Sequence, residues 1–148
     1  MGFFPYAKAA EPVSFKPATP TPVTSLTLVM LGLGQTATFT PTTDSKVLVL
    51  VTSYATTNTT ITSMTIGGRY GTGTAPANGA AVTGTRFGSD TDISFEAAVQ
   101  GQDDAFTIAE VLSLTGGTKY WFDLAVATSN ASDAAVVRHI SISLIQET

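Results

Sequence analysis

The sequence predicts an all-β domain, an eight-stranded antiparallel sandwich of the jelly-roll type, preceded by an extended N-terminal arm. Hydrophobic types make up 43% of the 148 residues, which is enough for the core of one domain. After Ser25 the apolar residues recur with a period of two, and no window shows the 3.6-residue period of a helix. Charged residues are only 12%, and 26 Thr, 19 Ala, 13 Gly and 12 Ser take their place. This composition is typical of strands divided by tight turns.

Residues 1–24 differ from the rest because they hold five of the seven prolines. Proline fixes φ and has no N–H, so this arm is expected to be extended, neither a helix nor a central strand. Phe3, Phe4, Tyr6 and Phe15 are too many aromatic residues for a solvated linker. The arm either folds back on its own domain or docks on a partner, and we favour a partner.

Residues 25–148 are expected to form the sandwich. Runs rich in Thr, Val, Ile and aromatic residues, separated by Gly, Asn, Asp and Pro, predict strands at 25–31, 35–40, 46–56, 60–67, 91–100, 106–114, 119–128 and 135–146. Eight short antiparallel strands favour a jelly roll. The run Lys46–Val51 is apolar on both faces, which predicts a strand covered on both sides.

One long irregular stretch, 68–90, is predicted to be a loop, and loops of this length are commonly functional. Arg69, Tyr70 and Arg86 within it are candidates for binding a sugar or an acidic ligand. The alternative is that the stretch contains a short edge strand near Ala80–Phe87.

The residues that carry catalysis or bind metals are scarce. There is no cysteine, and the single histidine, His139, lies in the last predicted strand, where a hydrogen-bonded structural role is expected. No Gly-x-Ser-x-Gly elbow is present to display a nucleophile. Asp90 and Asp92 would point the same way on a strand and could hold Ca²⁺, but solvated turn residues explain them more simply. The chain is therefore expected not to be an enzyme and to use no cofactor or metal.

Charge and hydropathy limit the partners. A net charge of −4 with only seven Lys and Arg argues against nucleic acid, whose binding depends on basic residues. The N-terminus lacks the basic and apolar regions of a signal peptide, and the longest apolar stretches, Leu28–Leu31 and Val47–Val51, are far too short for a membrane helix. A soluble chain in a reducing compartment is expected.

The shortage of charged residues predicts a symmetric homo-oligomer, because too few Lys, Arg, Asp and Glu are present to cover an isolated monomer. Trp121 falls opposite the core face defined by Tyr120 and Phe122 in its alternating strand. The indole must lie under a loop or in a subunit interface. We favour the interface, where aromatic residues are enriched.

Three segments of the chain resemble the TNF/C1q-like jelly rolls carried by structural proteins of tailed bacteriophages. They correspond to an early strand pair, the penultimate hairpin and the closing strand, and they are Phe39–Pro41 with Ser45–Val51, Leu114–Leu124 and Arg138–Ile145. The resemblance covers residues 24–147 and leaves the arm outside. It implies a trimeric module on a virion, and no catalytic residue carries over from it.

The expected function is that of a non-enzymatic virion protein, a capsid decoration or cement protein that binds the outside of a phage head as a homotrimer. Its partner would be the major capsid protein or another virion protein, with assembly in the host cytoplasm and neither nucleic acid nor membrane bound. The alternative is a tail, fibre or spike module that binds a host receptor or glycan through loop 68–90. The chain has no shaft repeat, which favours decoration.

Overall fold

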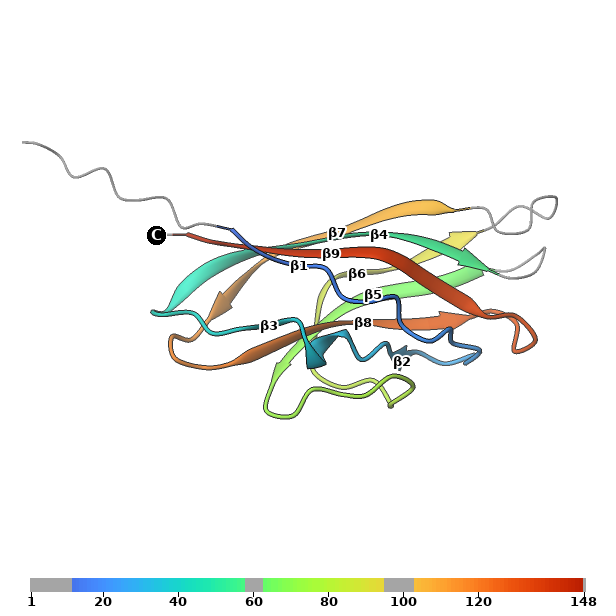
Figure 1. Cartoon of the computed structure of the whole chain (residues 1–148), viewed down its shortest axis with the longest axis horizontal. Helices are drawn as coiled ribbons and strands as arrows, with labels where there is room; N and C mark the ends of the chain where they lie inside the picture. The colour runs from blue at the N-terminus through green and yellow to red at the C-terminus, as the bar shows by residue number, and fades with distance from the viewer. Residues whose placement is uncertain (1–11, 58–62, 95–102, 148) are drawn as a thin grey trace, which may run out of the picture.

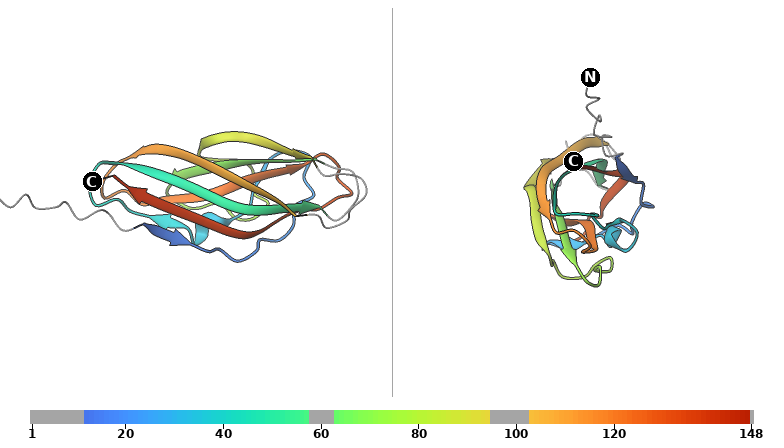
Figure 2. Two further views of the ribbon diagram at one scale, coloured as in Figure 1. Left: turned by 90° about the horizontal axis from the view of Figure 1, so that it is seen from above. Right: turned by 90° about the vertical axis from the view of Figure 1, so that its left-hand side faces the viewer.

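The computed structural model describes residues 12–57, 63–94 and 103–147, and these residues form two antiparallel sheets packed face to face (Figures 1 and 2). The elements in chain order are β1 (Val13–Phe15), β2 (Val29–Met30), the 3-10 turn η1 (Leu33–Gln35), β3 (Thr38–Phe39), β4 (Ser45–Thr57), β5 (Ser63–Thr72), β6 (Thr85–Ser94), β7 (Asp104–Leu114), β8 (Tyr120–Thr128) and β9 (Ala135–Gln146). Phe3, Phe4 and Tyr6 of the arm lie outside the described residues.

The strand order is that of a jelly roll. The first sheet runs β1-β9-β4-β7, and the second runs β2-β8-β5-β6, with β3 also paired to β8. From β3 onward the chain crosses between the sheets at every connection except the one that joins β5 to β6. Consecutive strands therefore face each other across the core, and the all-β jelly-roll sandwich predicted from the sequence is confirmed.

The core lies between the two sheets and follows from alternation along the strands. Ile140, Ile142 and Leu144 of β9 are buried, and they pack in one cluster with Phe122 and Leu124 of β8. At the centre of the second sheet the aromatic rings of Tyr70, Phe87, Tyr120 and Phe122 contact one another, with centroids 6.2–6.5 Å apart. Such ring pairs add about 0.5–1.5 kcal/mol each beyond the area they bury.

The prediction that the run Lys46–Val51 is covered on both faces is wrong. In β4 the Val47, Val49 and Val51 side chains are fully buried, but Leu48 and Leu50 lie on the outward face and are only half-buried. The strand with both faces covered is β8, because residues 28–30 and the 73–84 loop lie over its outer face. Two-sided apolarity in β4 therefore marks an uncovered apolar surface.

The predicted loop at 68–90 is strand at both of its ends. β5 continues to Thr72 and β6 begins at Thr85, so the connecting loop is only 73–84. The start of β6 falls within the alternative edge strand expected near Ala80–Phe87. Gly84, with φ 81°, marks the re-entry into the sheet, and a Cβ there would lie 2.5 Å from the Trp121 ring.

The second half of the arm belongs to the sandwich. β1 pairs with β9 in the register Val13 to Leu144 and Phe15 to Ile142, and Phe15 packs against the core. The expected domain boundary at residue 25 therefore falls after the chain has already joined the first sheet. For Phe15, folding back on its own domain is the arrangement observed.

The edge strands β6 and β7 meet along one side of the sandwich. Glu110 projects from β7, and its Oε2 accepts a hydrogen bond from the backbone N–H of Gly88 in β6. Gly88 has φ 65° and sits where the pairing of β5 and β6 shifts register. A charged side chain thus ties the free edges of the two sheets together.

Candidate interaction surfaces

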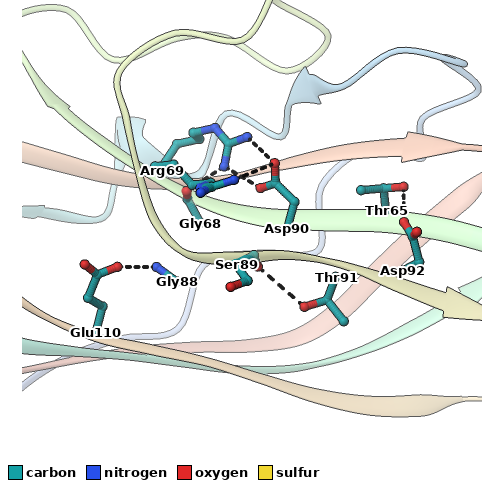
Figure 3. A network of polar contacts seen from close by, with 10 residues as sticks. Thr65, Gly68, Arg69, Gly88, Ser89, Asp90, Thr91, Asp92 and Glu110 are labelled. Carbon is teal, nitrogen blue, oxygen red and sulfur yellow. Dashed lines mark hydrogen bonds and ion pairs between the residues drawn. The ribbon is translucent and has the colours of Figure 1, made fainter.

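Arg69 is the buried centre of a polar network on the outward face of the second sheet (Figure 3). Only 5% of it is exposed, and Nη1 and Nη2 donate to Oδ1 and Oδ2 of Asp90 at 2.8 and 3.2 Å. This hydrogen bonding holds the pKa of Asp90 below its ordinary value. Gly67 leaves the space for the pair, because a Cβ there would lie 1.8 Å from Asp90 Oδ1. The bidentate pair fastens β5 to β6 and is structural.

The ligand site predicted from Arg69, Tyr70 and Arg86 is not formed. Arg69 is occupied by Asp90, and neighbouring Tyr70 points to the opposite face, where its ring stacks on Phe122 at 6.3 Å. Burial raises the pKa of Tyr70. Arg86 remains exposed, 3.8 Å from Asp90. The sequence places these residues in one stretch, but strand alternation sends adjacent side chains to opposite sides.

The carboxylates considered for Ca²⁺ have separate partners. Asp90 binds Arg69, and Asp92 accepts a hydrogen bond from the Thr65 hydroxyl at 2.5 Å (Figure 3). Within the described part of the chain, no three His, Cys, Asp or Glu side chains are grouped so that they could hold a metal ion. Asp103, which is adjacent to Asp104 in the sequence, forms an ion pair with Arg138 at 2.6 Å.

Trp121 is buried by its own chain, so the preferred assignment to a subunit interface is wrong and the loop alternative describes it. It is only 3% exposed, packs with Met30 and Ala75, and donates from Nε1 to the Thr72 carbonyl at 3.2 Å. Gly71 makes room for the indole, since a Cβ there would lie 2.5 Å from its ring. An indole that is already desolvated offers almost no further area to a partner.

Asp123, which the sequence interpretation missed, holds the turn before β3 against β8. Its carboxylate accepts the backbone N–H groups of Gly32 and Leu33 at 3.0 Å and of Leu124 at 2.7 Å. The side chain is buried, and desolvation raises its pKa to about 6 despite these hydrogen bonds. The signal was a lone charge within the apolar alternation of residues 120–128.

His139 lies at an irregularity of β9. It has a left-handed φ of 54°, next to the point where the pairing of β4 and β9 shifts register. Its exposed ring meets Tyr54 edge to face at 5.9 Å and 87°. The observed role is a bulge held by ring packing, close to the structural role expected for this residue.

The outward face of β9, β4 and β7 carries exposed apolar side chains that these assignments leave without a role. Ile145, Leu48 and Val111 stand directly opposite one another across the three strands. Val111 is 49% exposed and Ile145 is 40% exposed. In the next row Leu50 lies between Ser143 and Ala109, and in the row after that Thr52 lies between Ser141 and Thr107. We call these nine residues the apolar face, and none of them is charged.

The fold and these surfaces define a class: a jelly-roll module with an extended segment along one sheet edge and an exposed sheet face whose nine central residues carry no charge. No helix among the described residues is long and apolar enough to cross a membrane. No protein-family model matches the sequence. No curated protein matches it either.

Solved structures similar to this chain include an Eiger TNF and two strains of infectious bursal disease virus. Eiger TNF from S. frugiperda is 14% identical over 93% of this chain and 85% of that chain, with a TM-score of 0.45. Infectious bursal disease virus is similar in its Gx strain (11% identity, TM-score 0.49) and in its Gt strain (11%, 0.48). These matches cover 100% and 97% of this chain but only 41% and 36% of the viral chains. The jelly-roll assignment itself rests on the strand order and pairing of this chain.

Proposed function

We propose that the chain is a non-enzymatic structural protein of a virion, a decoration or cement module that assembles as a homotrimer and binds the outside of a bacteriophage capsid. The observation that carries this proposal is the apolar face. Its exposed row of Ile145, Leu48 and Val111 has no partner within the described chain, and uncharged apolar patches commonly mark protein interfaces.

The composition of the apolar face suits contact between flat sheets. In the two rows beyond the aliphatic row, every side chain except Leu50 is Ser, Thr or Ala, which are short and allow two backbones to approach closely. Burying the row removes apolar surface from water at about 25 cal/mol per Å². Because no charge has to be desolvated, the association keeps most of that gain.

The self-association is tested by light scattering on the purified chain. We expect three times the 15.3 kDa chain mass. Val111→Lys should yield a folded monomer, because it places a charge in the exposed aliphatic row of the contact. Val82→Lys is the matched control, since Val82 is 39% exposed but lies on the 73–84 loop of the other sheet. A monodisperse monomer for the unmodified chain would refute the trimer.

Capsid binding is assigned to the first residues of the arm, where Phe3, Phe4 and Tyr6 stand ahead of β1. β1 fixes Val13–Phe15 to the sheet edge, next in sequence to the part of the arm that carries these aromatic residues. The test replaces these three aromatic residues by alanine in the full chain and measures co-sedimentation with undecorated shells. We expect the variant to stay trimeric and to lose shell binding, and equal binding by both proteins would refute the assignment.

The tail, fibre or spike alternative is separated by position on the particle. Gold labelling of a tagged chain on intact virions should decorate the head surface. Label confined to the tail would replace decoration with the alternative. The receptor or glycan site that supported that alternative included Arg69 and Tyr70, which the fold uses internally.

A further inference from the structure

Residues 12–23 run antiparallel to β9 along nearly its whole length but pair with it only at the two ends. At one end Val13 to Phe15 pair with Leu144 to Ile142, and at the other a single bridge joins Val23 to Ala135. We call the intervening residues Lys16–Pro22 the strap. Pro17, Pro20 and Pro22 within it have no N–H to offer to the edge of β9.

The strap is loosely packed on both sides. Between it and β9 lies a hollow of about 460 Å³, lined by Lys16–Thr19 and His139–Ser141. On its other side a hollow of about 300 Å³ separates it from residues 31–36 and Asn78. Between its ends, the strap is held to the domain by a hydrogen bond from Asn78 Nδ2 to the Thr21 carbonyl, at 3.2 Å.

β9 itself is held firmly from its other side. It pairs with β4 from Gln146 opposite Val47 to Ala135 opposite Thr57. Removing β1 would therefore leave β9 in place as a preformed sheet edge. The edge of β9 is the fixed part of this contact, and β1 with the strap is the part that can separate.

We propose that in the assembled protein β1 of each copy pairs with β9 of a neighbouring copy, in the register that the structure shows. This inference rests on the self-association proposed above. Exchange between identical chains preserves every contact of β1, so it costs little and links the subunits. The proline-rich strap is stiff and extended, at about 3.1 Å per residue, and loses little entropy when it bridges two copies.

The position of β9 favours a neighbour as the source of the strand. Ser141, Ser143 and Ile145 of β9 belong to the apolar face, so a copy docked there stands directly beside the edge that β1 occupies. Val13, at the start of β1, is 36% exposed in the single chain. The exchanged strand is therefore continuous with the proposed contact between copies.

Ser14 and Ser143 provide the test. They are register partners with hydroxyls 3.4 Å apart, and the chain has no cysteine that could interfere. Ser14→Cys and Ser143→Cys chains are made separately, mixed under conditions that exchange subunits, and oxidised. A disulfide between residues 14 and 143 can then only join two chains, and mass spectrometry of the linked peptides identifies it.

The expected result is a covalent two-chain product from the mixed single variants, and covalent multimers from the Ser14→Cys/Ser143→Cys double variant. The matched control is Lys46→Cys/Ser113→Cys, which joins register partners of β4 and β7 and must close within one chain. A double variant that closes only within one chain while light scattering shows a trimer overturns the exchange alone. A monomeric mass overturns the proposed self-association and the exchange with it.

Discussion

The buried carboxylate of Asp123 accepts the backbone N–H of Leu33 at 3.0 Å, across 90 residues of sequence. This bond and its companion from Gly32 satisfy donors at the start of η1, and a third bond comes from the N–H of Leu124 within β8. The turn that leads into β3 is therefore positioned by one side chain of β8.

The first expectation is a pH dependence that originates at Asp123. Burial raises its pKa in the folded protein to about 6, above the ordinary 3.8 of the unfolded chain. The folded state binds more protons between these values, so the contribution is fully present below about pH 4 and is lost as pH rises through 6. A pKa difference of about two units corresponds to about 3 kcal/mol in the free energy of unfolding. Urea unfolding from pH 4 to 7.5 measures this slope, and Asp123→Asn should remove it. An unchanged slope in the variant would contradict the assignment.

The second concerns the Arg69–Asp90 pair. Asp90→Ala leaves a guanidinium that is 5% exposed without its bidentate acceptor, and we expect a loss of about 2 kcal/mol in the free energy of unfolding. The partial exposure of Asp90 keeps the loss below that of a fully buried pair. Asp92→Ala, which removes only an exposed hydrogen bond to Thr65, is the control and should cost less than about 0.5 kcal/mol.

The ionisation of Asp90 adds an opposite pH effect. Its pKa is lowered in the folded state, so its stabilisation is present above the ordinary 3.8 and is lost as pH falls through the folded value. Below pH 4 the free energy of unfolding of the unmodified chain should therefore fall more steeply than that of Asp90→Ala, because the variant has no carboxylate to protonate at this position. Parallel curves for the two proteins in that range would contradict this account.

The third compares two glycines with the same backbone conformation. Gly84 and Gly73 have φ 81° and 77°, but a Cβ at Gly84 would lie 2.5 Å from both the Trp121 ring and the Tyr70 carbonyl, whereas Gly73 faces open space. Gly73→Ala should cost only about 1 kcal/mol for the left-handed backbone. Gly84→Ala should cost clearly more, about 3 kcal/mol, because the buried indole must move. Thermal unfolding of both variants measures the difference in stability. Equal losses of stability would show that the indole can shift freely.

The fourth uses Trp121, the only tryptophan. Because its ring is enclosed by the chain itself, its fluorescence should be blue-shifted and resistant to acrylamide. Trp121→Ala should lower the free energy of unfolding by about 3–5 kcal/mol. The oligomeric mass measured under folding conditions should not change. A stable variant that dissociates would restore the interface assignment.

Strands with regular alternation could be predicted from the sequence, and β8 and β9 were found nearly to their ends because one face of each is apolar throughout. β1 could not be predicted, because a strand of three residues among prolines shows no periodicity. Its pairing also depends on the edge of β9, which begins 120 residues after β1 ends. The first half of β6 was predicted only as the alternative edge strand near Ala80–Phe87, because Gly84, Gly88 and Asp90 are typical turn residues. In the structure Gly84 lies against the Trp121 ring, and Gly88 lies at the register shift between β5 and β6. Asp90 accepts a hydrogen bond from Arg69.

The surfaces were harder to predict than the fold. Whether a two-sided apolar strand is central or exposed depends on what the rest of the chain places over it, and only the assembled sheets show that β8 is covered and β4 is not. The same limit applied to Trp121. The sequence predicts that the indole is buried, but it does not tell whether the same chain or a neighbouring subunit covers it.

The contact between Glu110 and Gly88 also disfavours pairing of the sheet edges of two molecules. Unpaired edges of sheets recruit other strands without regard to identity, and such zippering grows without limit into fibres. A carboxylate anchored across the seam between β6 and β7 puts charge where a stacked neighbour would have to sit. The chain should therefore resist edge-to-edge growth along β6 and β7 even at high concentration.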